Sequence, residues 1–178
     1  MALDIEFKRL SNNAKLPTKL TDNATGFVLY AAEDVVIEPG AIGVIKTDIA
    51  INTPGGYSTE IRPLNRLSLK TKFRVIHGTV DEAFIGNLTV IADNLNPVVI
   101  AEHPVDGAKL GKVPLEQPLP VGGQAGVGEY PKGTYMVRKG DAIAQLVLHV
   151  TPATNVAEVI GALDERGRTR IGWGDVTY

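Results

Sequence analysis

The sequence of 178 residues contains no cysteine and no long hydrophobic run. Without cysteine the chain can form no disulfide and offers no thiolate, although the compartment stays open because secreted proteins can also lack cysteine. The longest apolar stretches, such as Ala142 to Leu148, are far shorter than the roughly 20 residues that cross a bilayer. We therefore expect no thiol chemistry and no membrane partner.

A strong excess of charge of one sign is also missing, because the formal net charge is -2. Such a chain has no overall field that would attract DNA, RNA or an anionic membrane surface. Nucleic acid is therefore not an expected partner. The amino-terminal stretch MALDIEFKRL carries charges every few residues, so it has no apolar segment of signal-peptide length. We expect that the protein is not secreted by a signal peptide.

The residues that are present favour one folded domain spanning 1–178. Hydrophobic residues make up 44% of the sequence and charged residues 21%, which is typical of a soluble globular protein. Apolar and polar residues alternate from Ile45 to Asn52 and from Asn87 to Asp93, which is the period of a strand with one buried face. The turn-forming stretch Thr53 to Gly56 precedes Tyr57 to Ile61, which can run back beside the first of these strands.

Further turn residues divide the chain into short strands. Pro39-Gly40 and Lys139 to Asp141 each lie beside a β-branched run, at Val35 to Ile37 and Ala142 to Val150. Only Leu64 to Lys70 is expected to form a helix, of about two turns, with Pro63 at its first position. The pattern predicts an all-β sandwich or jelly roll with one short helix.

Residues 97–133 interrupt this pattern, since 13 of these 37 residues are proline or glycine. We interpret the segment as an insertion and not as a core strand. Long loops in compact domains are usually either functional or disordered. Two interpretations stay open: a surface loop without a role, and an arm that docks onto a partner.

Asp81 is the most prominent single carboxylate, in the stretch Gly78 to Phe84, which we expect to be a tight hairpin. A general base must be held rigidly beside the water that it activates, and an aspartate at a strand end can meet this need. Aspartate is equally common in turns for local hydrogen bonding. The three histidines, His77, His103 and His149, show no spacing typical of a metal site.

Near the carboxyl terminus, Arg166, Arg168 and Arg170 would share one face of an extended segment, followed by Trp173. Such a row could bind a phosphate chain or an acidic protein surface. The alternative is a solvated charged tail. The sequence has neither a G-x-S-x-G nucleophile elbow nor a G-x-x-x-x-G-K-[ST] phosphate loop.

Five stretches together resemble the trimeric dUTPase family, particularly its phage-borne members with an extra insertion before the fourth motif. They read KLPTKLTDNATGFVLYAAEDVVIEPG, IKTDIAINTPGGY, HGTVDEAFIGNLTV, VRKGDAIAQLVLHV and LDERGRTRIGWG. The similarity extends over nearly all of the chain outside residues 97–133. It implies a dUTPase-like β jelly roll that forms a homotrimer. In that family, three sites shared between subunits hydrolyse dUTP with magnesium to dUMP and pyrophosphate.

The resemblance assigns roles to several residues that are kept. Asp81 matches the aspartate that holds the attacking water, and Gly78 belongs to the same motif. Phe84 matches the aromatic residue that packs under the deoxyribose, without the usual tyrosine hydroxyl. Gln145 matches the glutamine of the fourth motif near the phosphates. In the closing arm at 164–178, Arg166 matches the family's arginine, and Arg168 is a further candidate for binding phosphate.

Other family positions are changed in this chain. Val28 stands where the family has the aspartate that orients water on magnesium. Leu64 and Asn65 replace the phosphate-binding arginine and serine. In the closing arm, Ile171 and Trp173 replace the base-stacking phenylalanine and a serine. Most residues that would face the triphosphate therefore differ from the family pattern.

The changes weigh against hydrolysis, because removing one charge-stabilising donor typically lowers a rate by about 10²–10³. Arg62 and Arg66 flank Leu64 and could each replace the missing cation. No residue replaces the carboxylate that is missing at Val28. We therefore expect no cofactor, with magnesium required only if the protein is an active dUTPase.

Two functions stay open. The one we favour from the sequence is a non-catalytic homotrimer of phage origin with a structural or binding role, located in the virion or the host cytoplasm. Through residues 97–133 it would contact the major capsid protein, as a decoration or cement protein, or a host regulatory protein. The alternative is a magnesium-dependent diphosphatase acting on dUTP or on a modified pyrimidine deoxynucleoside triphosphate, with Asp81 as its catalytic residue.

Overall fold

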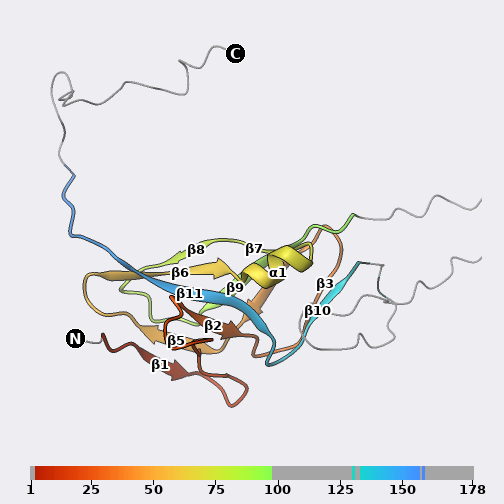
Figure 1. Ribbon diagram of the computed structural model, residues 1–178, viewed down its shortest axis with the longest axis horizontal. Helices are drawn as coiled ribbons and strands as arrows, with labels where there is room; N and C mark the ends of the chain where they lie inside the picture. Colours follow the sequence, from red (N-terminus) through yellow and green to blue (C-terminus); the bar gives the residue numbers. More distant parts are fainter. Residues whose placement is uncertain (1–2, 98–129, 131–132, 157, 159–178) are drawn as a thin grey trace, which may run out of the picture.

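The computed structural model describes residues 3–97, 130, 133–156 and 158, which form β-sheets around one core with a single short helix at the side (Figure 1). The insertion at 97–133 lies almost entirely outside the described residues, and the closing arm at 164–178 lies wholly outside them. No helix in the described part of the chain has the length and apolar character needed to cross a membrane.

All strand pairs are antiparallel, and the strands form two larger sheets and two pairs. The first sheet has the order β2 (Gly26–Tyr30), β11 (Ala142–Val150), β6 (Tyr57–Pro63) and β8 (Gly78–Val80). The second has the order β4 (Ile42–Lys46), β9 (Thr89–Asn94) and β7 (Phe73–Val75). The pairs are β1 (Glu6–Arg9) with β5 (Ile49–Asn52) and β10 (Tyr135–Val137) with β3 (Val35–Ile37). This arrangement confirms the all-β fold class.

The two larger sheets share one hydrophobic core. Leu29 and Leu146 of the first sheet are buried in the same cluster as Ile45 and Val90 of the second. Gly43 allows β3 and β4 to pack closely, because a Cβ atom at this position would lie 2.1 Å from Cδ1 of Ile37. Any larger residue at position 43 would have to displace the side chain of Ile37.

The alternation from Ile45 to Asn52 predicts the inward face correctly, but not the burial of Ala50 or the division of the segment into two strands. Ile45, Thr47, Ile49 and Ile51 are all buried, as expected for one inward face. The segment is nevertheless two strands, β4 and β5, because Asp48 adopts a left-handed backbone conformation with φ of 52°. Its carboxylate accepts hydrogen bonds from the side chains of Ser11 and Asn87 at 2.6 and 2.8 Å, which stabilise this break.

Two further local predictions are wrong. Tyr57 to Ile61 does not run back along the preceding strand, because β6 pairs with β11 and β8 whereas β5 pairs with β1. The helix α1 spans Asn65–Lys70, so Pro63 ends β6 and does not open the helix. Leu64 is the N-cap residue and provides no side-chain capping hydrogen bond.

Asn94 and Asn96 hold the two ends of the segment 97–133 close together. The buried amide of Asn94 donates hydrogen bonds to the carbonyl oxygens of Ile37 and Gly133, both at 2.8 Å. The amide of Asn96 donates to the same Gly133 oxygen at 2.8 Å. The chain therefore leaves and re-enters the described domain at neighbouring points.

Candidate functional site

The residues assigned by sequence lie in two separate cavities of the described chain. We call the first the α1 pocket; it has a volume of about 320 Å³ and is lined by Leu20, Val28, Tyr30, Leu64, Asn65, Arg66, Ala142 and Gln145. The second, the Asp81 pocket, has a volume of about 370 Å³ and is lined by Ile61, Gly78, Thr79, Val80, Asp81, Phe84, Asn87, Leu88, Thr89 and Ile91. Arg166, Arg168, Ile171 and Trp173 lie outside the described residues.

Asp81 lies in a turn at the end of β8, and its side chain is exposed. The turn is closed by a hydrogen bond from the backbone N–H of Phe84 to the carbonyl oxygen of Asp81 at 3.0 Å. The segment is not the tight hairpin that the sequence predicts, because β8 pairs with β6 and not with the strand that follows. The neighbouring Glu82 fixes the turn by accepting a hydrogen bond from the backbone N–H of Gly56 at 2.9 Å.

Phe84 presents its ring to the Asp81 pocket and to solvent, with 41% of its surface exposed. Gly86 leaves space for this ring, since a Cβ atom there would lie 2.7 Å from Cζ of Phe84. The floor of the pocket is apolar and includes the buried residues Ile61 and Leu88. An exposed ring beside a carboxylate, over an apolar floor, suits a flat or sugar-like group next to a water molecule.

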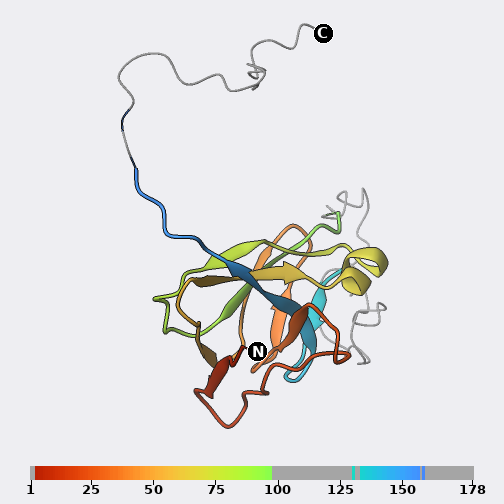
Figure 2. The same cartoon turned by 60° about the vertical axis from the view of Figure 1, so that its left-hand side comes forward.

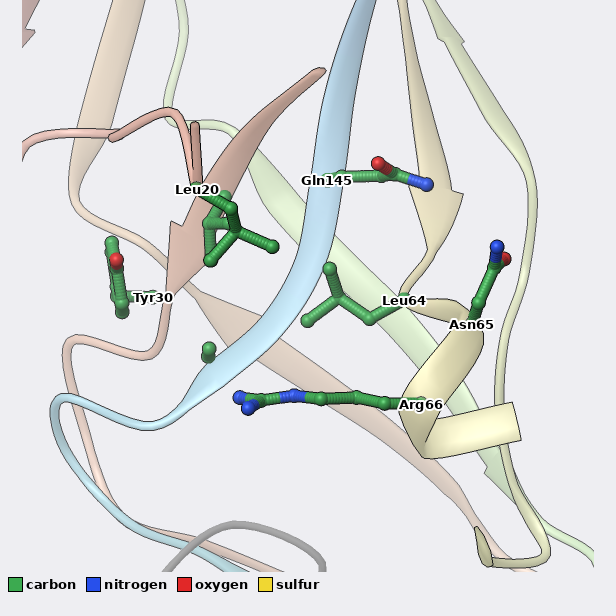
Figure 3. Close-up of a pocket in the computed structure, with 8 residues that line it drawn as sticks. Leu20, Tyr30, Leu64, Asn65, Arg66 and Gln145 are labelled. Carbon is green, nitrogen blue, oxygen red and sulfur yellow. The ribbon is translucent and has the colours of Figure 1, made fainter. Parts of the chain in front are cut away.

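The α1 pocket has an apolar wall where the family resemblance implies charged and polar groups. Val28 and Leu64 are almost completely buried, with 3% and 6% of their surfaces exposed. Val28 lies between two other segments of the chain. Its N–H donates a hydrogen bond to the carbonyl oxygen of Thr18 at 2.7 Å, and on the other side it lies opposite Gln145 of β11. The family resemblance singles out Val28, Leu64, Asn65 and Gln145 in three separate stretches of the sequence, and all four line this one pocket. Figure 3 shows Leu64, Asn65 and Gln145 around it.

Gln145 is fixed by a hydrogen bond from its Nε2 to the carbonyl oxygen of Pro63 at 3.0 Å. Its Oε1 faces Gly26, where an added Cβ atom would lie 3.0 Å away. The hydrogen bond therefore joins β11 to the end of β6 at the edge of the α1 pocket, while the side-chain oxygen lies close to Gly26 of β2.

A charged cluster on the first sheet was not found from the sequence. Glu60 accepts hydrogen bonds from Arg62, and its Oε2 lies 3.0 Å from Nε2 of both His77 and His149. The hydrogen bond from Arg62 lowers the pKa of Glu60 most, His77 lowers it further, and burial opposes the shift. Sequence spacing could not reveal this cluster, because His149 is brought beside Glu60 only by the pairing of β11 with β6.

The residues of the α1 pocket do not fit a magnesium site. Magnesium takes oxygen ligands, chiefly carboxylates and water. None of the described residues that line this pocket is acidic. Within the described part of the chain, no group of three or more histidine, aspartate or glutamate residues could hold a metal ion. We therefore assign no step of a reaction to a metal held here.

Comparison with known proteins gives a consistent set of similarities. The dUTPase family model matches residues 12–103. The deoxyuridine 5'-triphosphate nucleotidohydrolase of Ehrlichia canis is 42% identical over 89 residues, which are 48% of this chain and 58% of that protein. The enzyme of the same name from Syntrophotalea carbinolica is 28% identical over 180 residues, which are 99% of this chain and 98% of that protein.

Solved structures of phage dUTPases share the fold. A mutant dUTPase from phage phi11 of S. aureus superposes with a TM-score of 0.77 and 25% identity, covering 91% of this chain and 100% of that one. A mutant of the Staphylococcus bacteriophage 80alpha dUTPase, solved with dUpNHpp, has a TM-score of 0.72 and 28% identity, covering 98% and 100%. The alignments span only 58% to 66% of the relatives from Ehrlichia canis, Alkaliphilus metalliredigens and Helicobacter pylori. The matched family region covers more than half of the sequence, and the chain belongs to the dUTPase family.

Proposed function

We propose that this protein is a homotrimeric nucleotide hydrolase of the dUTPase type, which converts dUTP, or a modified pyrimidine deoxynucleoside triphosphate, into the monophosphate and pyrophosphate. The observation that carries the proposal is the Asp81 pocket. It keeps an exposed carboxylate and an exposed aromatic ring side by side. The family resemblance assigns these two residues the roles of water-holding aspartate and sugar-stacking ring. The names of the sequence relatives favour this activity over the non-catalytic role that we favoured from the sequence alone.

In this proposal Asp81 accepts a hydrogen bond from the attacking water and orients it, and Phe84 stacks against the deoxyribose. Gln145 and a cation of the α1 pocket contact the phosphates. The attacking oxygen forms a bond to phosphorus as the bond to the leaving pyrophosphate breaks, and the water's proton passes to the carboxylate. We expect a turnover well below the roughly 10 per second typical of enzymes, because the α1 pocket lacks charge-stabilising groups.

The two separate cavities fit a site that is shared between copies of the chain, as in the homotrimer that the family resemblance implies. Asp81 and Phe84 line one pocket of the described chain, whereas Gln145 and Leu64 line the other. In the proposed homotrimer the Asp81 pocket of one copy lies beside the α1 pocket of another, so that a single nucleotide contacts both sets. Light scattering should therefore give a mass three times that of the 19.0 kDa chain.

The test is pyrophosphate release from a panel of deoxynucleoside triphosphates. We expect release from dUTP that Asp81→Asn reduces by at least about 10², the usual contribution of a positioned base. Glu33→Gln removes one carboxylate charge at an exposed position outside both pockets and should leave the rate unchanged. Absence of release above background from the parent protein, or equal rates for the parent and Asp81→Asn, would disprove the hydrolase.

A second candidate function, a non-catalytic trimer that binds another protein, is favoured by one specific observation: Val28 and Leu64 make the wall of the α1 pocket apolar and buried. Such a trimer would be a capsid decoration protein or a regulator of a host protein, contacting its partner through residues 97–133. The 80alpha phage dUTPase is described as controlling transfer of virulence genes, so a regulatory role occurs among the structural neighbours. This candidate requires that the parent protein release no pyrophosphate from any nucleotide.

A further inference from the structure

Two arginines flank Leu64, and the structure distinguishes them. The guanidinium of Arg62 already has partners within the sheet. It donates hydrogen bonds to Glu60 of the same strand and lies 3.2 Å from Nε2 of His149 on β11. Arg66 lines the α1 pocket, is exposed, and has no ion pair or hydrogen bond to another residue of the described chain. Of these two arginines, Arg66 is therefore the one available to a ligand in the pocket.

The direction of the side chains supports this difference. Leu64 and Arg66 both extend from the start of α1 toward β11, on the side where Tyr30 and Leu20 lie (Figure 3). Asn65, between them in the sequence, also lines the pocket, but its side chain points toward the side of Gln145 and not toward β11 (Figure 3). The exposed guanidinium of Arg66 thus extends along the same side as the apolar wall formed by Leu64, where an anionic ligand in the pocket can reach it (Figure 3).

The described residues that line the α1 pocket include one cation and no acid. That cation is Arg66, and the other lining residues with described positions are apolar or uncharged. On the far wall, the Nζ atom of Lys15 lies 3.8 Å from the ring centroid of Tyr30. The hydroxyl of Tyr30 is hydrogen bonded to that of Thr18 at 2.6 Å, which fixes this wall. An anionic group entering the pocket therefore finds one unpaired guanidinium and a second positive charge nearby.

We propose that Arg66 is the phosphate-binding residue of the α1 pocket and that nucleotide binding there requires no divalent cation. The inference rests on the proposed function for the identity of the ligand, a pyrimidine deoxynucleotide. One guanidinium group can bind two oxygens of a phosphate at once, through two parallel hydrogen bonds. A pocket with one guanidinium and no carboxylate provides the counter-charge itself and offers no ligand to a metal.

The experiment measures binding by titration calorimetry with two ligands, dUTP and inorganic pyrophosphate, each in magnesium and in EDTA. We expect Arg66→Met to weaken the binding of both ligands by about 10- to 100-fold, the usual effect of losing hydrogen bonds to a charged group. Lys70→Met removes one cation from the same helix, outside the pocket lining, and should bind as the parent does. Replacing magnesium by EDTA should change the affinity of the parent less than about threefold, since that ratio corresponds to under 1 kcal/mol.

Each outcome separates this inference from the hydrolase proposal. If the parent hydrolyses dUTP and Arg66→Met binds both ligands as tightly as the parent, the inference is wrong and the hydrolase stands. If binding depends on Arg66 but no pyrophosphate is released, the inference stands and the hydrolase is wrong. Loss of binding in EDTA, or no binding of either ligand by the parent, would overturn the inference directly. A circular dichroism spectrum checks that both variants are folded.

Discussion

Glu60 shows how a single residue makes stability depend on pH. Its pKa is lowered, chiefly by the hydrogen bond from Arg62 and then by that from His77. A carboxyl with a lowered pKa in the folded state stabilises the fold above its unfolded pKa and loses this contribution as the pH falls through the folded pKa. The stabilisation is therefore complete at neutral pH and disappears below the ordinary value of 4.5.

We predict that Glu60→Gln lowers the free energy of unfolding at pH 7 and that this effect is smaller at pH 3, below the ordinary pKa of 4.5. Glutamine keeps the shape of the side chain but has no charge and cannot form the ion pair with Arg62. Urea titrations at several pH values would measure the difference between variant and parent. The same substitution at Glu33, which is exposed, is the control and should give a small difference that does not depend on pH. A difference for Glu60→Gln that is equal at pH 3 and pH 7 would contradict the assignment.

The pKa of Asp141 is shifted in the opposite direction from that of Glu60. Burial raises its pKa, although the hydrogen bond from the backbone N–H of Arg138 at 2.9 Å acts against the shift. Its contribution to stability is therefore greatest at low pH and is lost as the pH rises through the raised pKa. The carboxylate nevertheless has a structural role, because the hydrogen bond that it accepts from Arg138 stabilises the turn before β11.

At the scale of elements, β9 depends on a buried amide at its end. Asn94 donates to two carbonyl oxygens that belong to different parts of the chain, Ile37 at the end of β3 and Gly133 before β10. Its side-chain oxygen accepts a hydrogen bond from the backbone N–H of Asn96 at 3.0 Å. Leaving such groups buried without partners costs about 1–3 kcal/mol each.

Asn94→Ala should therefore lower the free energy of unfolding by about 2–4 kcal/mol, because the carbonyl of Ile37 and the N–H of Asn96 lose their partner. For a chain of this size we expect the melting temperature to fall by about 5–15 °C. Asn96→Ala is the matched control, with a smaller loss, since Asn96 is only partly buried and Gly133 keeps its bond from Asn94. Equal losses in the two variants, measured by differential scanning calorimetry, would show that the burial of Asn94 is not the cause.

Strands could be predicted from the sequence wherever a local pattern decides the structure. β3 and β11 have the predicted bounds, and the turns at Gly40, Gly56 and Gly140 adopt the positive φ that their glycines favour. The break at Asp48 could not be predicted, because it depends on hydrogen bonds from Ser11 and Asn87, residues far away in the sequence. Strand pairing failed for the same reason: β6 finds its partners across long distances in the chain.

The candidate site was predicted in part. The resemblance identifies Asp81, Phe84 and Gln145 together with the changed residues Val28 and Leu64. It does not show which arginine is free. Arg62 and Arg66 are equivalent candidates in the sequence. The structure distinguishes them, because Arg62 forms an ion pair with Glu60 whereas Arg66 lines the α1 pocket. Side-chain partners from other strands are the information that the sequence lacks at this site.

At the scale of the whole molecule, the two segments that leave the described domain do so at defined places, residues 151–156 after β11 and the segment 97–133 at Asn96 and Gly133 (Figure 1). In two views the domain is a closed set of sheets, and residues 151–156 run away from it after β11 (Figures 1 and 2). A hydrogen bond from the backbone N–H of Thr151 to the carbonyl of Gly56, at 2.8 Å, is the last backbone contact of this strand region in the described chain. The segment 97–133 starts and ends at one place, where Asn96 meets Gly133.

We predict that residues 98–131 can be replaced by a short Gly-Ser linker without loss of the fold. A Cβ atom at Gly133 would lie 3.0 Å from Cβ of Asn96, so the two ends are as close as in a short turn. Shortening a loop by about three doublings of length removes roughly 2 kcal/mol of closure entropy from the cost of folding. The melting temperature of the shortened chain, measured by calorimetry, should equal or exceed that of the parent.

The same shortened chain tests what the insertion does. If the domain alone forms the homotrimer, light scattering should give three chains per particle for the parent and for the shortened protein. Pyrophosphate release should also persist, because neither the α1 pocket nor the Asp81 pocket includes a described residue of the insertion. A shortened protein that is folded but monomeric would show instead that residues 98–131 hold the subunits together. A folded trimer that no longer binds a protein partner captured by the parent would assign the insertion to docking, because the domain that carries both pockets would be intact.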